Sequence, residues 1–370
     1  MAGETATTRV AAAVVAAAAA AAENDGSTPL VVRGHQLPLQ FDGIEDEVNF
    51  LGVLSALDFG SGFARELEQA GQEGAPQRPF EEVVLFGVMH MYISGAAIDA
   101  DGLRAVSAFG IEQHFGISST VEEEALGGAI RASVPGPLKP LVDLMVKTLN
   151  SLGAKLVDLG SKSLGHFLVE KCREEGPDLD AAAAVQLLAD TFGSVFEDRI
   201  PAQVAADAGA EGSLLLGRKA VRFLERVDDR FFEETAPGEQ AESLRYLLKD
   251  IAAKLPVKVD AELISGMHAL GLVFATDETE DPLEGTVVLD VSSPEDAARE
   301  QRVRAQAWMH AKALLAEPSI GEERITARQL DAFLRRSAEG HADGESETEE
   351  KEGKTEASKL ELIVRGTNHY

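Results

Sequence analysis

The residue of this chain best placed to do chemistry is Asp260, in the segment LPVKVDAELISGMHALGLV (residues 255–273). Apolar residues recur at helical spacing through this segment, so we expect a buried helix that begins near Asp260, after Pro256. An aspartate at that place commonly caps the helix, because its carboxylate accepts hydrogen bonds from the N–H groups of the first turn. A carboxylate fixed in this way at a pocket wall can also act as a nucleophile or stabilise a positive charge. The periodicity leaves both interpretations open.

Residue sets that commonly carry other kinds of catalysis are missing from the sequence. It has no HExxH pair, no Walker loop, no dinucleotide fingerprint and no Ser–His–Asp arrangement. The eight histidines have no metal-ligand spacing, and His90 and His114 are too far apart in the chain to suggest a local site. Cys172 is the only cysteine, which excludes a Cys-based zinc site. We expect no metal and no cofactor, and carboxylate chemistry remains, with Asp260 and Asp331 best placed.

The most basic stretch of the chain is Leu214–Phe232, which we expect to form a helix. Its cationic side chains are Arg218, Lys219, Arg222, Arg226 and Arg230. One interpretation is a solvated helix face on which Glu225 and its arginine neighbours form i,i+4 ion pairs. The other is an anion-binding site, which a locally basic helix in an acidic chain would provide. The sequence alone favours neither interpretation.

Helical patterns run through nearly the whole sequence, which predicts a mainly α protein with a multi-helix globular fold and at most a few short strands. Aromatic residues make up only 5% of the chain against 45% for all hydrophobic residues, so the core must be mostly Ala, Leu and Val, as in closely packed helices. No βαβ alternation and no repeat of fixed length is present. The clearest expected elements are helices at Phe80–Ile93, Asp99–Phe109, Glu112–Phe115, Leu138–Leu159, Ser163–Glu174, 294–315 and Thr326–Arg336, a helix capped by Asp180, and a short strand at Val287–Val291.

Composition divides the chain into four parts. Residues 1–29 form an Ala-rich extension that we expect to be disordered, and residues 30–337 form the helical domain, either as one body or as two lobes near 30–200 and 213–337. Residues 338–359 are acidic and of low complexity, which predicts a disordered loop. Residues 360–370 become apolar again, so we expect this segment to dock back on the domain.

The acidic charge restricts the partners and the compartment. The net charge is −29, so the surface repels a phosphate backbone and we expect no direct nucleic-acid partner, although a small phosphorylated ligand can still bind in a local basic pocket. The apolar run Val10–Ala22 is too short to span a bilayer, so we expect no membrane partner. A single cysteine suits the reducing cytoplasm, while the Ala-rich start also resembles an organelle transit peptide. Nothing in the sequence indicates an oligomeric state.

Several short segments, taken in order from about residue 34 to 370, carry a family resemblance. They are HQLPLQF, EVNFLGVLSALDFGSGF and FGVMHMYISG near the start, LGRKA around Lys219, LPVKVD and HALG around Asp260, and ITARQLDAFLR and RGTNHY near the end. Together they resemble the queuosine salvage family, the queuosine 5′-phosphate N-glycosylase/hydrolases, in its fungal and plant branch. Each segment is weak by itself, and their common order makes the set moderately specific.

The resemblance implies a fold, a reaction and a set of site residues. The fold would be related to the DNA glycosylase superfamily, and the reaction would hydrolyse the N-glycosidic bond of queuosine 5′-phosphate, a small nucleotide, to release queuine for tRNA modification. Asp260 would be the catalytic group that stabilises the sugar cation. Lys219 would face the phosphate or the departing base, and Asp331 would hydrogen-bond the base or its amine side chain.

The sequence departs from the family pattern around this site. Lys258 stands two residues before Asp260 in place of an aromatic residue, Ala332 replaces the aromatic residue after Asp331, and Arg335 replaces a tryptophan. Lys258 and Ala332 would therefore contact the substrate where family members stack an aromatic ring. These replacements motivate a second hypothesis, in which the protein is a catalytically impaired relative that acts as a nucleotide- or protein-binding helical module.

Overall fold

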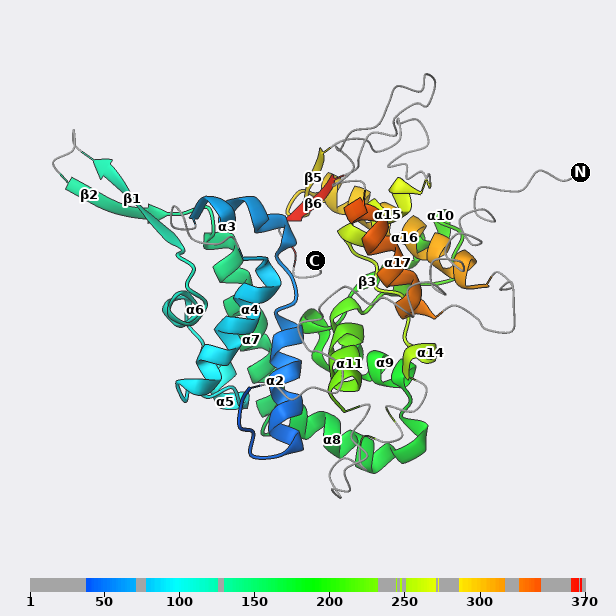
Figure 1. The fold of residues 1–370 in the computed structure, drawn as a ribbon, viewed down its shortest axis with the longest axis horizontal. Coiled ribbons are helices and arrows are strands. Elements are labelled where there is room, and N and C mark those ends of the chain that lie inside the picture. Colours follow the sequence, from blue (N-terminus) through cyan, green and yellow to red (C-terminus); the bar gives the residue numbers. More distant parts are fainter. Residues whose placement is uncertain are drawn as a thin grey trace, which may run out of the picture. The chain divides into compact units, whose positions relative to one another are not determined.

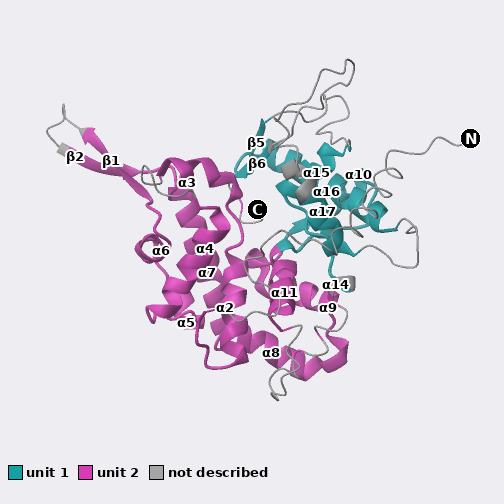
Figure 2. Ribbon diagram, viewed as in Figure 1, with its two compact units in different colours: residues 1–27, 198–218, 252–365 teal, residues 28–197, 219–251, 366–370 magenta. Residues whose placement is uncertain are grey.

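The computed structural model describes residues 38–70, 78–125, 130–231, 251–270, 286–316, 326–340 and 361–365, together with Leu244, Leu247, Leu272 and Thr367. The protein is mainly helical, as predicted (Figure 1). It divides into two compact units (Figure 2). Unit 1 comprises residues 1–27, 198–218 and 252–365, and unit 2 comprises residues 28–197, 219–251 and 366–370. Among the described helices, none combines the length and the apolar content needed to cross a membrane.

Unit 2 is built from helices that follow one another along the chain. They are α2 (Ile44–Ala56), α3 (Ala64–Ala70), α4 (Phe80–Ile93), α5 (Ala100–Arg104), α6 (Ala108–Phe115), α7 (Lys139–Asp158), α8 (Leu164–Glu175), α9 (Ala181–Phe192) and all of α11 (Arg218–Phe231) except its first residue, with short 3-10 turns at Ser61–Phe63, Gly176–Asp178 and Gly193–Val195. Helix α2 is almost wholly buried and packs against α8. A Cβ atom at Gly165 of α8 would lie 1.9 Å from the Glu45 carbonyl oxygen of α2, so only glycine permits this approach.

Side-chain caps fix several helix starts in unit 2. Asp180 caps α9 as predicted, because its carboxylate accepts a hydrogen bond from the Ala183 amide at 3.0 Å. The helix predicted at Asp99–Phe109 ends earlier, at Arg104 of α5, and the helix predicted at Glu112–Phe115 begins earlier, at Ala108 of α6. The hydroxyl of Ser107 accepts the Gly110 amide at 3.2 Å and starts α6 as a separate helix. A local cap here interrupts a pattern that the apolar spacing alone would continue.

A β-hairpin that has no clear signal in the sequence projects from unit 2 (Figure 1). Its strands are β1 (Thr120–Ala125) and β2 (Ile130–Pro135), which pair antiparallel with Thr120 opposite Pro135. Most of the described side chains of both strands are exposed, and β1 carries three successive glutamates at 122–124. An alternating apolar pattern marks a strand only when one face is buried, so this hairpin leaves no such signal.

Unit 1 combines short strands with three main helices. Its elements are β3 (Arg199–Ile200), α10 (Ala202–Asp207), β4 (Leu214–Leu215), α14 (Ile251–Lys254, whose first residue belongs to unit 2), α15 (Ala261–Ala269), β5 (Thr286–Asp290), α16 (Pro294–Ala316), α17 (Ala327–Gly340) and β6 (Glu361–Arg365). Strands β3 and β4 pair antiparallel, whereas β5 and β6 pair parallel with Thr286 beside Glu361. The predicted strand near Val287 is therefore present, and the apolar C-terminal segment supplies its partner.

Helices α15 and α17 position the candidate site in unit 1, and they approach each other closely. A Cβ atom at Gly266 of α15 would lie 2.1 Å from the Leu334 carbonyl oxygen of α17. Glycine at this position therefore lets the two backbones touch. The contact brings the start of α15 beside the face of α17 that carries Asp331 and Arg335.

Two of the predicted segments lie wholly or mostly outside the described residues. The Ala-rich extension at 1–29 is one of them. The other is the acidic loop predicted at 338–359, of which only residues 338–340 are described, as the end of α17.

Candidate functional site

Asp260 is the N-cap of α15, as predicted from the sequence. Its backbone is extended, and its Oδ1 atom accepts a hydrogen bond from the Leu263 amide at 3.0 Å. The residue is only 4% exposed. Capping holds the carboxylate in one orientation at a helix end where the helix dipole favours negative charge.

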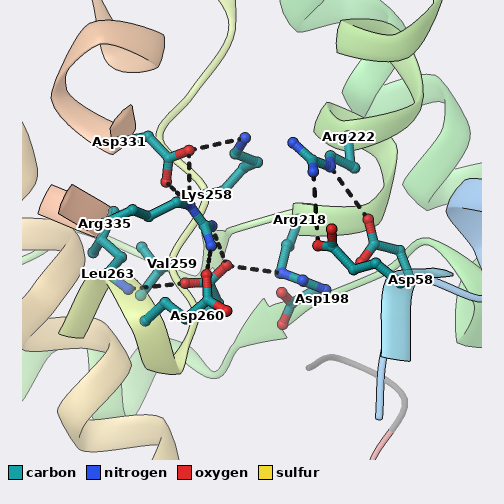
Figure 3. A network of polar contacts seen from close by, with 12 residues as sticks. Asp58, Asp198, Arg218, Arg222, Lys258, Val259, Asp260, Leu263, Asp331 and Arg335 are labelled. Atoms are coloured by element: carbon teal, nitrogen blue, oxygen red, sulfur yellow. Dashed lines mark hydrogen bonds and ion pairs between the residues drawn. The ribbon is translucent and has the colours of Figure 1, made fainter. Parts of the chain in front are cut away.

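The second carboxylate oxygen of Asp260 receives two guanidinium groups (Figure 3). Arg335 Nη2 donates to Oδ2 at 2.5 Å, and Arg218 Nε donates to the same atom at 3.2 Å. Arg218 precedes Asp260 by 42 residues and Arg335 follows it by 75. The fold of unit 1 therefore assembles this contact from three separate parts of the chain.

The charges around Asp260 keep its carboxyl group ionised. Burial alone would raise the pKa of Asp260, but the guanidinium groups of Arg335 and Arg218 and the hydrogen bond from the Leu263 amide outweigh burial and hold this pKa far below its usual range. Asp260 is thus an anion at any physiological pH. This charge state suits the stabilisation of a developing cation and is wrong for a general acid.

Asp331 belongs to the same group of contacts, through two cations. Arg335 Nε donates to both carboxylate oxygens of Asp331 at 3.1 Å, at i,i+4 spacing on α17. Lys258 Nζ lies 3.1 Å from Asp331 Oδ2, and both of these side chains are buried. Figure 3 shows Arg335 between the carboxylates of Asp331 and Asp260. We call Arg218, Lys258, Asp260, Asp331 and Arg335 the Asp260 network.

The predicted site residues of unit 1 therefore come together. Lys258 and Asp331 lie in the Asp260 network, and Ala332 is the half-buried neighbour of Asp331 on α17. Lys258, which stands where the family pattern has an aromatic residue, makes a buried ion pair. Its contact with substrate stays a prediction.

A second buried cluster of ion pairs holds the segment that precedes Asp260. Arg304 of α16 donates to Asp198 Oδ1 at 2.8 Å and to Glu300 Oε1 at 3.2 Å. It also donates to the Val259 carbonyl at 3.4 Å. Because Val259 directly precedes the cap residue, this cluster ties Asp260 to α16 and to the 198–218 segment.

Lys219, predicted to face a phosphate or the departing base, lies in unit 2, whereas the Asp260 network belongs to unit 1. Its ammonium group donates to the Ala56 carbonyl at 3.5 Å and lies 5.4 Å from the centre of the Phe59 ring. The side chain is buried. These contacts anchor the start of α11 against the end of α2. A role for Lys219 in substrate binding stays a prediction.

The interpretation of the basic helix α11 as a solvated face is wrong, because most of its charged side chains are buried. Arg226 lies 3.1 Å from Asp58 and donates to the Ser55 hydroxyl at 2.8 Å. Arg230 Nε lies 2.5 Å from Glu47 Oε1. Carboxylates from α2 and the residues after it thus supply counter-charges for α11. This burial of paired charge explains how an amphipathic, strongly basic pattern can belong to a core helix.

His90 and His114 are adjacent in space, which corrects the expectation that they do not form a local site. Their Nδ1 atoms are 3.2 Å apart and their ring centres 5.0 Å apart, on the packed helices α4 and α6. The separation of 24 residues carried no helical or strand periodicity that could reveal the contact. Within the described ranges, no three His, Cys, Asp or Glu side chains are grouped to hold a metal ion.

Sequence reasoning missed the two guanidinium groups on Asp260. Arg218 was one of several cations on a helix, and Arg335 was noted only as a replacement for an aromatic residue. The i,i+4 spacing of Asp331 and Arg335 is a signal for their own ion pair, but no local pattern links either arginine to Asp260.

A search with protein-family models finds no family that matches the chain, and a search of curated proteins finds no match.

Proposed function

We propose that the protein is an N-glycosidase that hydrolyses queuosine 5′-phosphate and releases queuine, with Asp260 as the catalytic carboxylate. The observation that carries the proposal is the state of Asp260, which is buried, oriented by the first turn of α15 and held as an anion. The family resemblance points to the same residue. The family, its DNA glycosylase-like fold and a cytoplasmic location are parts of this proposal.

The chemistry requires a fixed negative charge. Water adds to C1′ of the ribose, the C1′–N9 bond breaks, and its electron pair leaves with the base, which takes up a proton. Ribose 5-phosphate and queuine are the products. The transition state resembles an oxocarbenium ion, as in glycoside hydrolysis. Because queuine is a 7-deazapurine, protonation at N7 cannot assist its departure, so stabilisation of the sugar cation carries more of the barrier.

The remaining carboxylate of the network has a separate part in this proposal. Asp331 is buried, and Lys258 and Arg335 hold its carboxylate, a hydrogen-bond acceptor, in one orientation. An acceptor of this kind suits the amine and exocyclic N–H groups of queuine. Lys258, at the sequence position where the family pattern has an aromatic residue, orients Asp331.

The test is direct. Purified protein is incubated with queuosine 5′-phosphate, and free queuine is measured by mass spectrometry over time. We expect release by the wild type and a loss of about 10²–10³ in rate for Asp260→Asn, by analogy with the removal of one preorganised electrostatic group. If the wild type releases no queuine at enzyme concentrations that exceed the substrate, the proposed function is wrong.

The contacts of Asp260 also support a second candidate function. Both oxygens of Asp260 are engaged, and Arg335 places a full positive charge 2.5 Å from Oδ2. If that contact is permanent, the carboxylate is neutralised and the protein is the impaired nucleotide-binding relative. Equilibrium binding of the nucleotide without its cleavage, unchanged in Asp260→Asn, is the result expected in that case.

A further inference from the structure

His90 and His114 form a pair of potential metal ligands in unit 2, and the proposed N-glycosidase chemistry does not use them. Their Nδ1 atoms are 3.2 Å apart, and the centres of the two rings are 5.0 Å apart. His90 is exposed and His114 is half-buried, so an ion can reach the pair from solvent. Imidazole is the commonest protein ligand of transition metals. Whether the pair can chelate one ion depends on how the two rings are turned toward each other.

The two distances fit chelation of a tetrahedral ion. Two imidazole nitrogens that bind one zinc ion at about 2.0–2.1 Å and at the tetrahedral angle lie about 3.3 Å apart, with ring centres about 5.2 Å apart. An ion with a right angle between its ligands, as in square-planar or octahedral geometry, would bring the nitrogens to about 2.9 Å. A straight hydrogen bond between the rings would hold their centres about 5.5 Å apart. The observed separation of 5.0 Å is closer to the zinc chelate than to the hydrogen bond.

Packing fixes the two helices that carry the pair, α4 and α6, which lie side by side (Figure 1). A Cβ atom at Gly87, one turn before His90, would lie 2.1 Å from the ring of Phe115. Glycine at this position therefore lets the residue next to His114 pack directly against α4. Ile111, one turn before His114, is wholly buried. Because core contacts hold both backbones, an ion can bind without moving either helix.

The position of the pair at two helix ends gives a separate reason to expect a cation. His90 lies in the last turn of α4 and His114 in the last turn of α6. The C-terminal end of a helix carries a partial negative charge, which stabilises a cation nearby. An ion bound between these rings would lie near both ends and interact favourably with each.

We propose that His90 and His114 chelate one zinc ion through their Nδ1 atoms, with the proton of each ring on Nε2. Within the described parts of the chain, no third His, Cys, Asp or Glu side chain joins them, so water or a donor atom of a ligand fills the remaining positions. A structural zinc site has four protein ligands. A site with two therefore exchanges its ion with solvent and keeps positions open. This site is independent of the proposed N-glycosidase activity.

The experiment titrates chelator-treated protein with zinc chloride by isothermal titration calorimetry. It compares the wild type with His90→Gln, His114→Gln, the double variant and the control His166→Gln. His166 also belongs to unit 2, but it contacts Ser161 and Glu170 and neither histidine of the pair. The control should therefore bind zinc as the wild type does.

We expect each single variant to bind zinc more than about tenfold more weakly than the wild type, because a lost ligand costs at least as much affinity as a lost outer-shell partner. The double variant should lose no more than either single variant, since one substitution already breaks the chelate. Circular dichroism confirms that the variants are folded. Equal zinc affinity in the wild type and both single variants overturns the proposal. So do additive losses in the double variant, which would indicate two separate histidines.

Hydrogen exchange on the wild type gives a second readout that needs no variant. Zinc that joins α4 to α6 should slow the exchange of amides in these two helices and leave those of α9 unchanged. No change in α4 and α6 at zinc saturation, or an equal change in α9, overturns the proposal.

Discussion

At the scale of single residues, Asp260 makes two kinds of stabilising contact, and Asp260→Asn should affect them differently. It caps α15 and it is the counter-charge of Arg218 and Arg335. Asparagine is nearly as good a cap as aspartate, so capping alone predicts a small effect of Asp260→Asn. The ion pairs change this expectation, because asparagine removes the negative charge that pairs with two largely buried guanidinium groups.

We therefore predict that Asp260→Asn lowers the free energy of unfolding by about 1.5–3 kcal/mol, the range for hydrogen bonds to charged groups. Urea unfolding followed by circular dichroism measures the change. Ser107→Ala, which removes a cap without any ion pair, should cost only about 1 kcal/mol. Equal losses in the two variants would show that the ion pairs contribute nothing.

The contact between His90 and His114 makes the stability of unit 2 depend on pH. Burial, assisted by the neighbouring His90, lowers the pKa of His114 below its usual value. The unfolded chain therefore binds more protons than the folded chain as the pH falls through about 6.5, the unperturbed pKa of histidine. The contribution of the neutral His114 side chain to the free energy of unfolding is fully present above that pH and is lost progressively below it.

We predict that His114→Gln flattens the fall in melting temperature between about pH 7 and pH 5. Thermal unfolding across this range, with His166→Gln as a control on α8, measures the effect. The control should keep the wild-type slope, because His166 contacts Ser161 and Glu170 on and beside α8, and not His90 or His114. A slope that His114→Gln leaves unchanged would contradict the prediction.

At the scale of elements, the sequence predicts helices and caps, because local apolar spacing and capping residues encode them. Apolar spacing and caps gave the helix at Phe80–Ile93 and the cap of α15. The exposed hairpin β1–β2 has no buried face and so leaves no pattern. The arginines on Asp260 are 42 and 75 residues away from it. Charge pairing over such separations depends on how unit 1 packs, and no periodicity in one sequence records it.

The contact of α15 with α17 gives a prediction about Gly266. A methyl group there would meet the backbone of Leu334 at 2.1 Å, and backbone cannot rotate away as a side chain can. We expect Gly266→Ala to destabilise the protein by about 1–3 kcal/mol and to weaken any activity of the Asp260 network, since α17 carries Asp331 and Arg335.

The matched control is Gly110→Ala in α6. The nearest atom to its added methyl group is the Ser107 hydroxyl oxygen at 3.6 Å, an ordinary contact. Because alanine is the better helix former, this variant should be neutral or up to about 1 kcal/mol more stable. Equal effects of the two substitutions in urea unfolding would mean that the α15–α17 approach is not tight.

At the scale of the whole molecule, the two units are interleaved along the chain. Unit 1 takes residues 198–218 from between two parts of unit 2. That segment supplies Asp198 to Arg304 and Arg218 to Asp260. Neither unit is therefore a contiguous piece of sequence, and a boundary drawn from composition alone would cut unit 1.

We predict that a fragment that begins at residue 219 does not fold unit 1 properly, because Arg304 loses Asp198 and Asp260 loses Arg218. A fragment that begins at residue 198 retains both partners. Comparing the two by hydrogen exchange at the α15 and α16 amides tests this, and equal protection in both fragments would contradict it.

The parallel pairing of β5 with β6 has a consequence for the order of events during synthesis. The ribosome makes β5 first, and then α16 and α17, before it makes the strand that completes the sheet. Until β6 is made, β5 presents an open edge to other chains, and pairing two strands so far apart in the sequence is slow. A nascent chain stalled between α17 and β6 would thus be the form most exposed to chaperones and to aggregation.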